Sequence, residues 1–139
     1  MTALPPTPDS LRAALKPLWE AGEFRLIVLF GSLAKGRGGP ASDLDLGFLP
    51  VDAMDEIRLT AEVVRLTHWN DVDVVDLRRA DPLSAMEVAR DGVVLFCEDP
   101  SVFTEFRSLA FRRYIDSAKL RQGQRRALDR FEQRRHEPD

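Results

Sequence analysis

Four short runs of apolar residues divide the chain at intervals, and each has the length of a single β-strand. The first, residues 24–30, reads Phe-Arg-Leu-Ile-Val-Leu-Phe and is apolar almost throughout, which is typical of a strand buried on both faces. The other three predicted strands cover residues 43–49, 72–77 and 93–97. Helical patterns separate these runs, so the predicted class is α/β, with a small sheet flanked by helices.

The segments between the strands carry start and stop signals of helices. The predicted helices cover residues 10–21, 53–67, 81–90 and 99–134. We expect Asp9 or Ser10 to cap the first helix and Asp81 to cap the third. One face of the second helix, which we expect to be buried, carries Met54, Ile57, Ala61 and Val64.

Length and composition favour one globular domain. The chain has 139 residues, of which 44% are hydrophobic and 31% charged. No apolar run approaches the roughly 20 residues of a transmembrane helix, and residues 1–10 lack the pattern of a secretory signal. Cys97 is the only cysteine, which excludes an internal disulfide and a zinc site built on cysteines. We therefore expect a cytoplasmic protein.

Charge is distributed unevenly along the chain. Residues 1–104 carry 10 basic and 17 acidic side chains, whereas residues 105–135 carry 10 basic and 4 acidic ones. We therefore divide the single domain into a core, residues 1–98, and a C-terminal basic helix, residues 99–135, packed on it. Gly123 is a point where this helix could break or kink. Such a helix can bind nucleic acid or an acidic partner, and the alternative is a solvated helix face.

The candidate chemistry lies between the first two predicted strands. Gly31-Ser32 follows the first strand and is expected to open a short helix at 32–35, and Asp43 and Asp45 enter the second strand. Side chains two residues apart on a strand share a face, so two carboxylates would repel each other unless a cation lay between them. Mg²⁺ prefers one or two carboxylates together with substrate phosphates, and a glycine-containing turn can cradle phosphate. The combination suggests phosphoryl or nucleotidyl transfer, although two aspartates alone also fit a solvated strand edge.

A third carboxylate is expected from the third predicted strand. If this strand neighbours the second, Asp73 completes a three-carboxylate cluster. Asp76 is the competing candidate, one register away near the strand end. We favour Asp73 because Val72 and Val74 pair naturally with the core, which leaves Asp76 to bond with a neighbouring arginine.

Two cations lie in the glycine-rich loop after Gly31-Ser32. Lys35 and Arg37 are placed to neutralise triphosphate charge, although both also fit an exposed loop. The loop is neither a Walker A motif, which needs Gly-Lys-Ser/Thr, nor a Rossmann fingerprint.

Together these residues give the chain a family resemblance. Gly31-Ser32, ten further residues and Asp43-Leu44-Asp45 match the GSx10DxD signature of the DNA polymerase β-like nucleotidyltransferase superfamily. The resemblance covers about residues 10–98. Within the superfamily, the chain most resembles the minimal nucleotidyltransferases that serve as antitoxins of HEPN-domain toxins. The resemblance implies a polymerase β-like fold with a small mixed sheet and a C-terminal helical extension.

The resemblance also implies roles for individual residues. Asp43 and Asp45 are expected to hold two Mg²⁺ ions, with Asp73 as a further metal ligand that helps activate the acceptor hydroxyl. Gly31 and Ser32 are expected to bind the phosphates of ATP. The implied reaction moves AMP from ATP to a tyrosine of a HEPN ribonuclease toxin, which is the expected partner. The alternatives are an antitoxin that acts by binding alone and a small-molecule nucleotidyltransferase of the aminoglycoside-modifying kind.

Overall fold

A computed structural model describes residues 4–136 of the chain, the side chains of 135 and 136 excepted. Its centre is a four-stranded mixed sheet in the order β3-β2-β1-β4. The strands are β1 (Phe24–Phe30), β2 (Leu44–Pro50), β3 (Val72–Asp76) and β4 (Val93–Cys97). β1 pairs antiparallel with β2 and β4, whereas β2 and β3 are parallel. The expected α/β class and small mixed sheet are confirmed.

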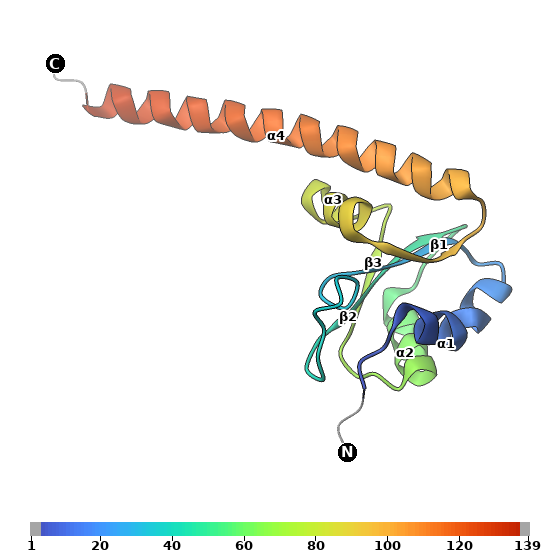
Figure 1. The fold of residues 1–139 in the computed structure, drawn as a ribbon. Coiled ribbons are helices and arrows are strands. Elements are labelled where there is room, and N and C mark those ends of the chain that lie inside the picture. Colours follow the sequence, from blue (N-terminus) through green and yellow to red (C-terminus); the bar gives the residue numbers. More distant parts are fainter. Residues whose placement is uncertain (1–3, 137–139) are drawn as a thin grey trace.

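Helices cover both faces of the sheet. One face carries α1 (Pro8–Glu20) and α2 (Glu56–Thr67), and the other carries α3 (Pro82–Asp91) and the first part of α4 (Pro100–His136), as Figure 1 shows. The central strand β1 contributes alternate side chains to the two apolar cores. Ile27 and Leu29 pack with α1 and α2, whereas Leu26 and Val28 pack with Val88 of α3. This two-sided burial explains why residues 24–30 form a continuous apolar run.

Two expectations about the first helices are wrong in detail. Thr7, and not Asp9 or Ser10, is the N-cap of α1, and its hydroxyl accepts a hydrogen bond from the backbone N–H of Ser10. Pro8 follows the cap at the first helical position, where its fixed backbone angle is favourable. In α2, the buried side chains are Leu59 and Val63, whereas the expected Ile57 is 86% exposed.

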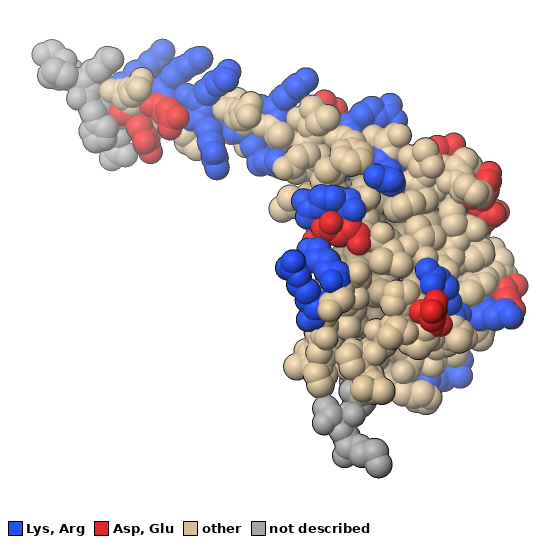
Figure 2. Space-filling model, in the orientation of Figure 1, with Lys and Arg blue, Asp and Glu red and all other residues tan. Residues whose placement is uncertain are grey.

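The later elements agree closely with the sequence. Asp81 caps α3 by accepting hydrogen bonds from the amides of Leu83 and Ser84. The helix α4 runs without a break through Gly123. Its second half projects away from the rest of the molecule (Figure 1) and carries many basic side chains (Figure 2). No helix in the described part of the chain is long and apolar enough to cross a membrane.

Candidate active site

The parallel pairing of β2 and β3 places two of the predicted aspartates side by side. Asp45 and Asp73 are direct register partners across the two strands. Directly opposed residues in a sheet project to the same face, so the two carboxylates lie next to each other. Asp43 lies just before β2 and is exposed, as is Asp73, whereas Asp45 is half-buried. The condition that the sequence left open is met, because the second and third strands are neighbours and Asp73 lies beside Asp45.

Asp45 lies in a strongly negative environment. Its pKa is raised to about 6, chiefly because burial disfavours the charged carboxylate. Repulsion from Asp73, Asp43 and then Glu87 raises this pKa further. Glu87 belongs to α3, so the helix that covers this face of the sheet adds a fourth negative charge to the surroundings of Asp45. Sequence reasoning missed Glu87, because nothing in its local pattern shows that α3 packs over β1 on this face of the sheet.

Asp76 belongs to a separate ion pair away from this cluster. It pairs in register with Phe48 and is 4% exposed. The guanidinium of Arg78 donates to both of its carboxylate oxygens, at 2.9 and 3.1 Å. These side-chain hydrogen bonds hold the pKa of Asp76 below its ordinary value, against the effect of burial. Geometry therefore favours Asp73 over Asp76 as the third carboxylate beside Asp45.

Gly31 lies directly against the Asp45 carboxylate. Its φ is +76°, a conformation that favours glycine. A Cβ at this position would overlap Asp45 Oδ2 and would lie 3.1 Å from Asp45 Cγ. The chain can therefore bring the Gly31-Ser32 backbone this close to the carboxylates only with glycine at position 31.

The expected short helix at 32–35 is instead a hydrogen-bonded turn. The amide of Lys35 donates to the carbonyl of Gly31 at 3.3 Å, and that of Arg37 to the carbonyl of Ser32 at 3.0 Å. Gly36 has a φ of +69°, which ends the helical path. Among the described residues, the amides of residues 32–34 donate to no backbone carbonyl. These amides are free to receive an anion such as a phosphate, as P-loop-like turns do.

The two candidate cations differ in their surroundings. Lys35 Nζ lies 3.6 Å from Asp91 Oδ2, at the C-terminal end of α3. Asp91 also pairs with Arg90 at 2.8 Å. Arg37 is exposed, and within residues 4–136 it forms no ion pair. Lys35 is thus held at the edge of the turn, whereas Arg37 is free to move in the loop.

A loop contact fixes the chain just before Asp43. The indole Nε1 of Trp69 donates to the carbonyl of Ser42 at 2.9 Å, and the Ser42 hydroxyl accepts from the amide of Gly39 at 2.7 Å. The amide of Leu44 donates to the carbonyl of Asp71 at 2.7 Å. These bonds tie the entry to β2 to the start of β3, which orients the aspartates that follow.

The carboxylates are suited to a cation but do not yet converge on one. In the described part of the chain, no three carboxylate, imidazole or thiolate groups are arranged to hold a metal ion as they stand. The Asp45 carboxylate is nevertheless half-buried and surrounded by other carboxylates, so a divalent cation would favour its ionised form. Oxygen donors of this kind fit Mg²⁺, so the residues present suit the ion that the sequence motif implies.

Comparison with known proteins decides the family. The sequence profile of the family described as "Polymerase beta, Nucleotidyltransferase" matches residues 15–101, which include both strands and the turn that form the site. The chain belongs to this nucleotidyltransferase family. The family expected from the GSx10DxD pattern is therefore confirmed.

Two curated relatives carry the name protein adenylyltransferase MntA. The one from Shewanella oneidensis is 34% identical over 76 residues, 53% of this chain, and the match spans only about half (55%) of that relative. The one from Aphanizomenon flos-aquae is 27% identical over 143 aligned positions, which cover 93% of this chain and 95% of that relative.

Solved structures share the fold over most of the chain. A chain from a toxin–antitoxin structure with AMP-PNP has a TM-score of 0.74 at 24% identity and covers 84% of this chain and 97% of its own length. A chain from the tri-AMPylated Shewanella oneidensis HEPN toxin in complex with its MNT antitoxin has a TM-score of 0.70 at 22% identity, covering 88% and 98%. These likenesses confirm the polymerase β-like nucleotidyltransferase fold.

Proposed function

We propose that this chain transfers AMP from ATP to a tyrosine hydroxyl of a HEPN-domain toxin and so acts as its antitoxin. The observation that carries the proposal is the Asp45–Asp73 pair with the Gly31 turn directly against it. The relatives named protein adenylyltransferase and the toxin–antitoxin structures of the same fold support the acceptor class. ATP is supported as the donor by the AMP-PNP in one of those structures. The proposed location is the cytoplasm.

In the proposed reaction, the tyrosine oxygen bonds to the α-phosphorus of ATP, and the bond from that phosphorus to the bridging oxygen breaks. Pyrophosphate leaves, and AMP stays on the tyrosine. We assign acceptance of the hydroxyl proton to the Asp73 carboxylate; its exposure beside Asp45 supports this role. The free amides after Gly31, together with Lys35, bind and orient the triphosphate.

Asp43, Asp45 and Asp73 would hold Mg²⁺. When bound, the ion neutralises charge on the phosphates and on the leaving group. Asp45 is the most buried of the three carboxylates and lies beside both Asp73 and Gly31, so it is the residue on which the arrangement depends most.

The test pairs the chain with a purified HEPN-domain protein, sought first among the products of neighbouring genes. The wild-type pair is incubated with Mg²⁺ and ATP, and the toxin is weighed by mass spectrometry. We expect AMP on a toxin tyrosine, and we expect Asp43→Asn with Asp45→Asn to abolish it while complex formation persists. Toxin neutralised without added AMP, or neutralised equally by the variant, would instead establish an antitoxin that acts by binding. AMP found on aminoglycosides and not on the toxin would establish the small-molecule enzyme.

A further inference from the structure

The helix α4 presents an exposed apolar line along its length. Leu109, Leu120 and Phe131 follow one another at intervals of eleven residues. Eleven residues make about three helical turns, so the three side chains project from the same face. Their exposed fractions are 50%, 65% and 63%. We call these three residues the α4 stripe. Large apolar side chains aligned on one face mark an interaction surface more strongly than scattered ones do.

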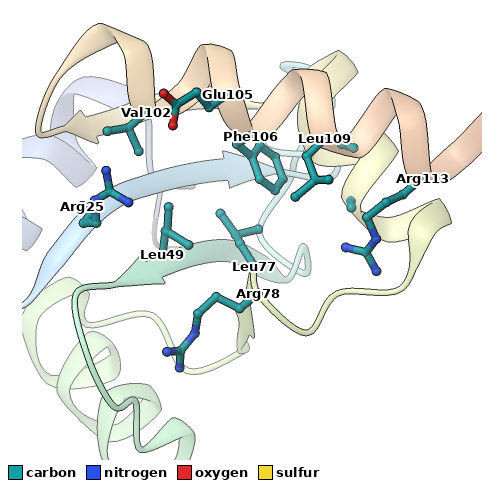
Figure 3. Close-up of a pocket in the computed structure, with 11 residues that line it drawn as sticks. Arg25, Leu49, Leu77, Arg78, Val102, Glu105, Phe106, Leu109 and Arg113 are labelled. Atoms are coloured by element: carbon teal, nitrogen blue, oxygen red, sulfur yellow. The ribbon is translucent and has the colours of Figure 1, made fainter.

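The α4 stripe begins at a cavity in the body of the molecule. Leu109 lines a hollow of about 330 Å³ between α4 and the ends of the strands (Figure 3). Its other apolar walls come from Leu49, Leu77, Val102 and Phe106. Arg25, Arg78 and Arg113 also line it, but their guanidinium groups already donate to Glu98, to a buried aspartate and to a backbone carbonyl. Glu105 adds a carboxylate to the lining, which disfavours an anion further. The cavity therefore suits an apolar side chain better than an anion.

The second half of α4 lacks support from the rest of the molecule. Every residue from 119 to 134 is exposed. Helices in proteins gain most of their stability from packing of an apolar face, and an isolated helix of this length is marginal in water. Covering Leu120 and Phe131 would therefore stabilise the helix as well as bury apolar surface.

Charge selects the kind of surface that can cover the stripe. Basic side chains flank it on both sides, and Figure 2 shows them along the projecting part of the helix. They include Arg112, Lys119, Arg121, Arg130 and Arg134, and basic side chains outnumber the acidic Asp116, Asp129 and Glu132 over this stretch. A second copy of α4 laid against the first would bring these like charges together, which is unfavourable. An acidic surface would pair with them.

The position of the stripe relates it to the candidate active site. The first part of α4 packs on α3, where Ala110 of α4 lies in one buried cluster with Ala85 and Ala89 of α3. Asp91, the last residue of α3, holds Lys35 of the turn after β1. In Figure 1 the projecting part of α4 leaves the body on the side where α3 lies. A protein bound along the α4 stripe would therefore lie on the α3 side of the molecule, which also carries this turn.

We infer that the α4 stripe and its cavity bind an acidic, helical surface of the protein that carries the acceptor tyrosine. The identity of that protein rests on the proposed function. Leu109 to Phe131 spans roughly 33 Å, a length that a packed helix can follow. An apolar side chain of the partner fills the cavity at the base, and acidic side chains meet the basic flanks.

The test compares two pairs of substitutions with the same spacing. Leu120→Glu with Phe131→Glu places two carboxylates on the stripe, and Gln122→Glu with Gln133→Glu places two on the opposite face of the same helix. All four positions are exposed, so both variants should fold. Binding of the same HEPN-domain protein is measured by calorimetry at two salt concentrations, and AMP transfer is measured on the same samples.

We expect the stripe variant to bind roughly 100-fold more weakly, since buried apolar anchors dominate interface energies, and the Gln variant to bind within a few-fold of wild type. Added salt should weaken wild-type binding. The inference would be overturned if both variants lost binding equally, if neither lost binding, or if wild type did not bind at all. It would also be overturned if the chain self-associated and the stripe variant broke that self-association. If wild type bound the HEPN-domain protein through the stripe but transferred no AMP, the proposed function would be overturned, whereas the α4 stripe would still be a binding surface.

Discussion

Replacing Gly31 with alanine should disable the candidate active site far more than it destabilises the fold. The substitution has two effects that can be separated. Alanine at a φ of +76° costs about 1 kcal/mol in backbone conformation. The added Cβ would also overlap Asp45 Oδ2, so the carboxylate or the turn must shift by about 1 Å.

Gly36 provides the matched control. It has a φ of +69°, but a Cβ there would meet nothing within 4 Å. Gly36→Ala therefore carries the same backbone cost of about 1 kcal/mol without the contact on Asp45. Thermal unfolding of the two variants measures the shared cost, and we expect both to lose a few degrees relative to wild type.

The rate of AMP transfer then isolates the effect of the contact between the added Cβ and Asp45. A displacement of about 1 Å at a catalytic group can cost about 100-fold in rate, so we expect Gly31→Ala to lose at least that much, and Gly36→Ala to stay within a few-fold of wild type. The reasoning is refuted if both variants lose activity equally, because the backbone strain alone would then explain the effect. Full activity in Gly31→Ala would show that Asp45 does not act where the structure places it.

Three further predictions follow from the charged groups. The pKa of Asp45 is raised to about 6, so keeping this side chain ionised at pH 7 opposes folding. In the absence of metal, Asp45→Asn should therefore be more stable than wild type at pH 7. This difference in stability should vanish below about pH 4, where the wild-type carboxyl is protonated in both the folded and the unfolded chain. Added Mg²⁺ should raise the Tm of wild type but not of this variant. Arg78 lowers the pKa of Asp76, so Asp76→Asn should reduce the free energy of unfolding by about 2 kcal/mol at pH 7, measured by denaturant titration. This loss should disappear as the pH falls below the ordinary aspartate pKa of about 4. Lys35→Met should leave stability nearly unchanged, because the ion pair of Lys35 with Asp91 is partly exposed. The same variant should raise KM for ATP. An unchanged KM would show that Lys35 does not belong to the nucleotide site.

The strands were predictable because β1 lies in the middle of the sheet. A strand buried on both faces must be apolar at every position, and residues 24–30 show this directly. The aspartates were predictable for the complementary reason. Asp45 and Asp73 interrupt apolar strands with charge, which a buried sheet tolerates only where something compensates it.

The helix faces depended on packing that local pattern does not contain. In α2, Ile57 and Val64 follow helical spacing as well as Leu59 and Val63 do, and only contact with the sheet decides which pair is buried. At α1, Pro8 occupies the first helical position, so the N-cap is the preceding residue, Thr7. The predicted caps, Asp9 and Ser10, lie inside the helix.

Residues that approach the site from α3 were beyond sequence reasoning. Glu87 and Asp91 lie one helical turn apart; the charge of the first helps to raise the pKa of Asp45, and the second holds Lys35. Their roles follow from the packing of α3 over this face of the sheet, a contact between distant segments. Residues 32–35 form a turn and not the predicted helix, because Gly36 adopts a positive φ that the sequence pattern does not determine.

The central claim is that Asp73 and Asp45 together form the site of nucleotidyl transfer. The most direct test is the rate of AMP transfer from MgATP to the HEPN-domain partner by wild type, Asp73→Asn and Asp71→Asn. Asp71 is an exposed aspartate two residues before Asp73, and its contact with Leu44 uses only its backbone carbonyl. We predict that Asp73→Asn loses transfer by at least about 100-fold while Asp71→Asn stays near wild type. Transfer retained in Asp73→Asn, or lost equally in both, would contradict the assignment.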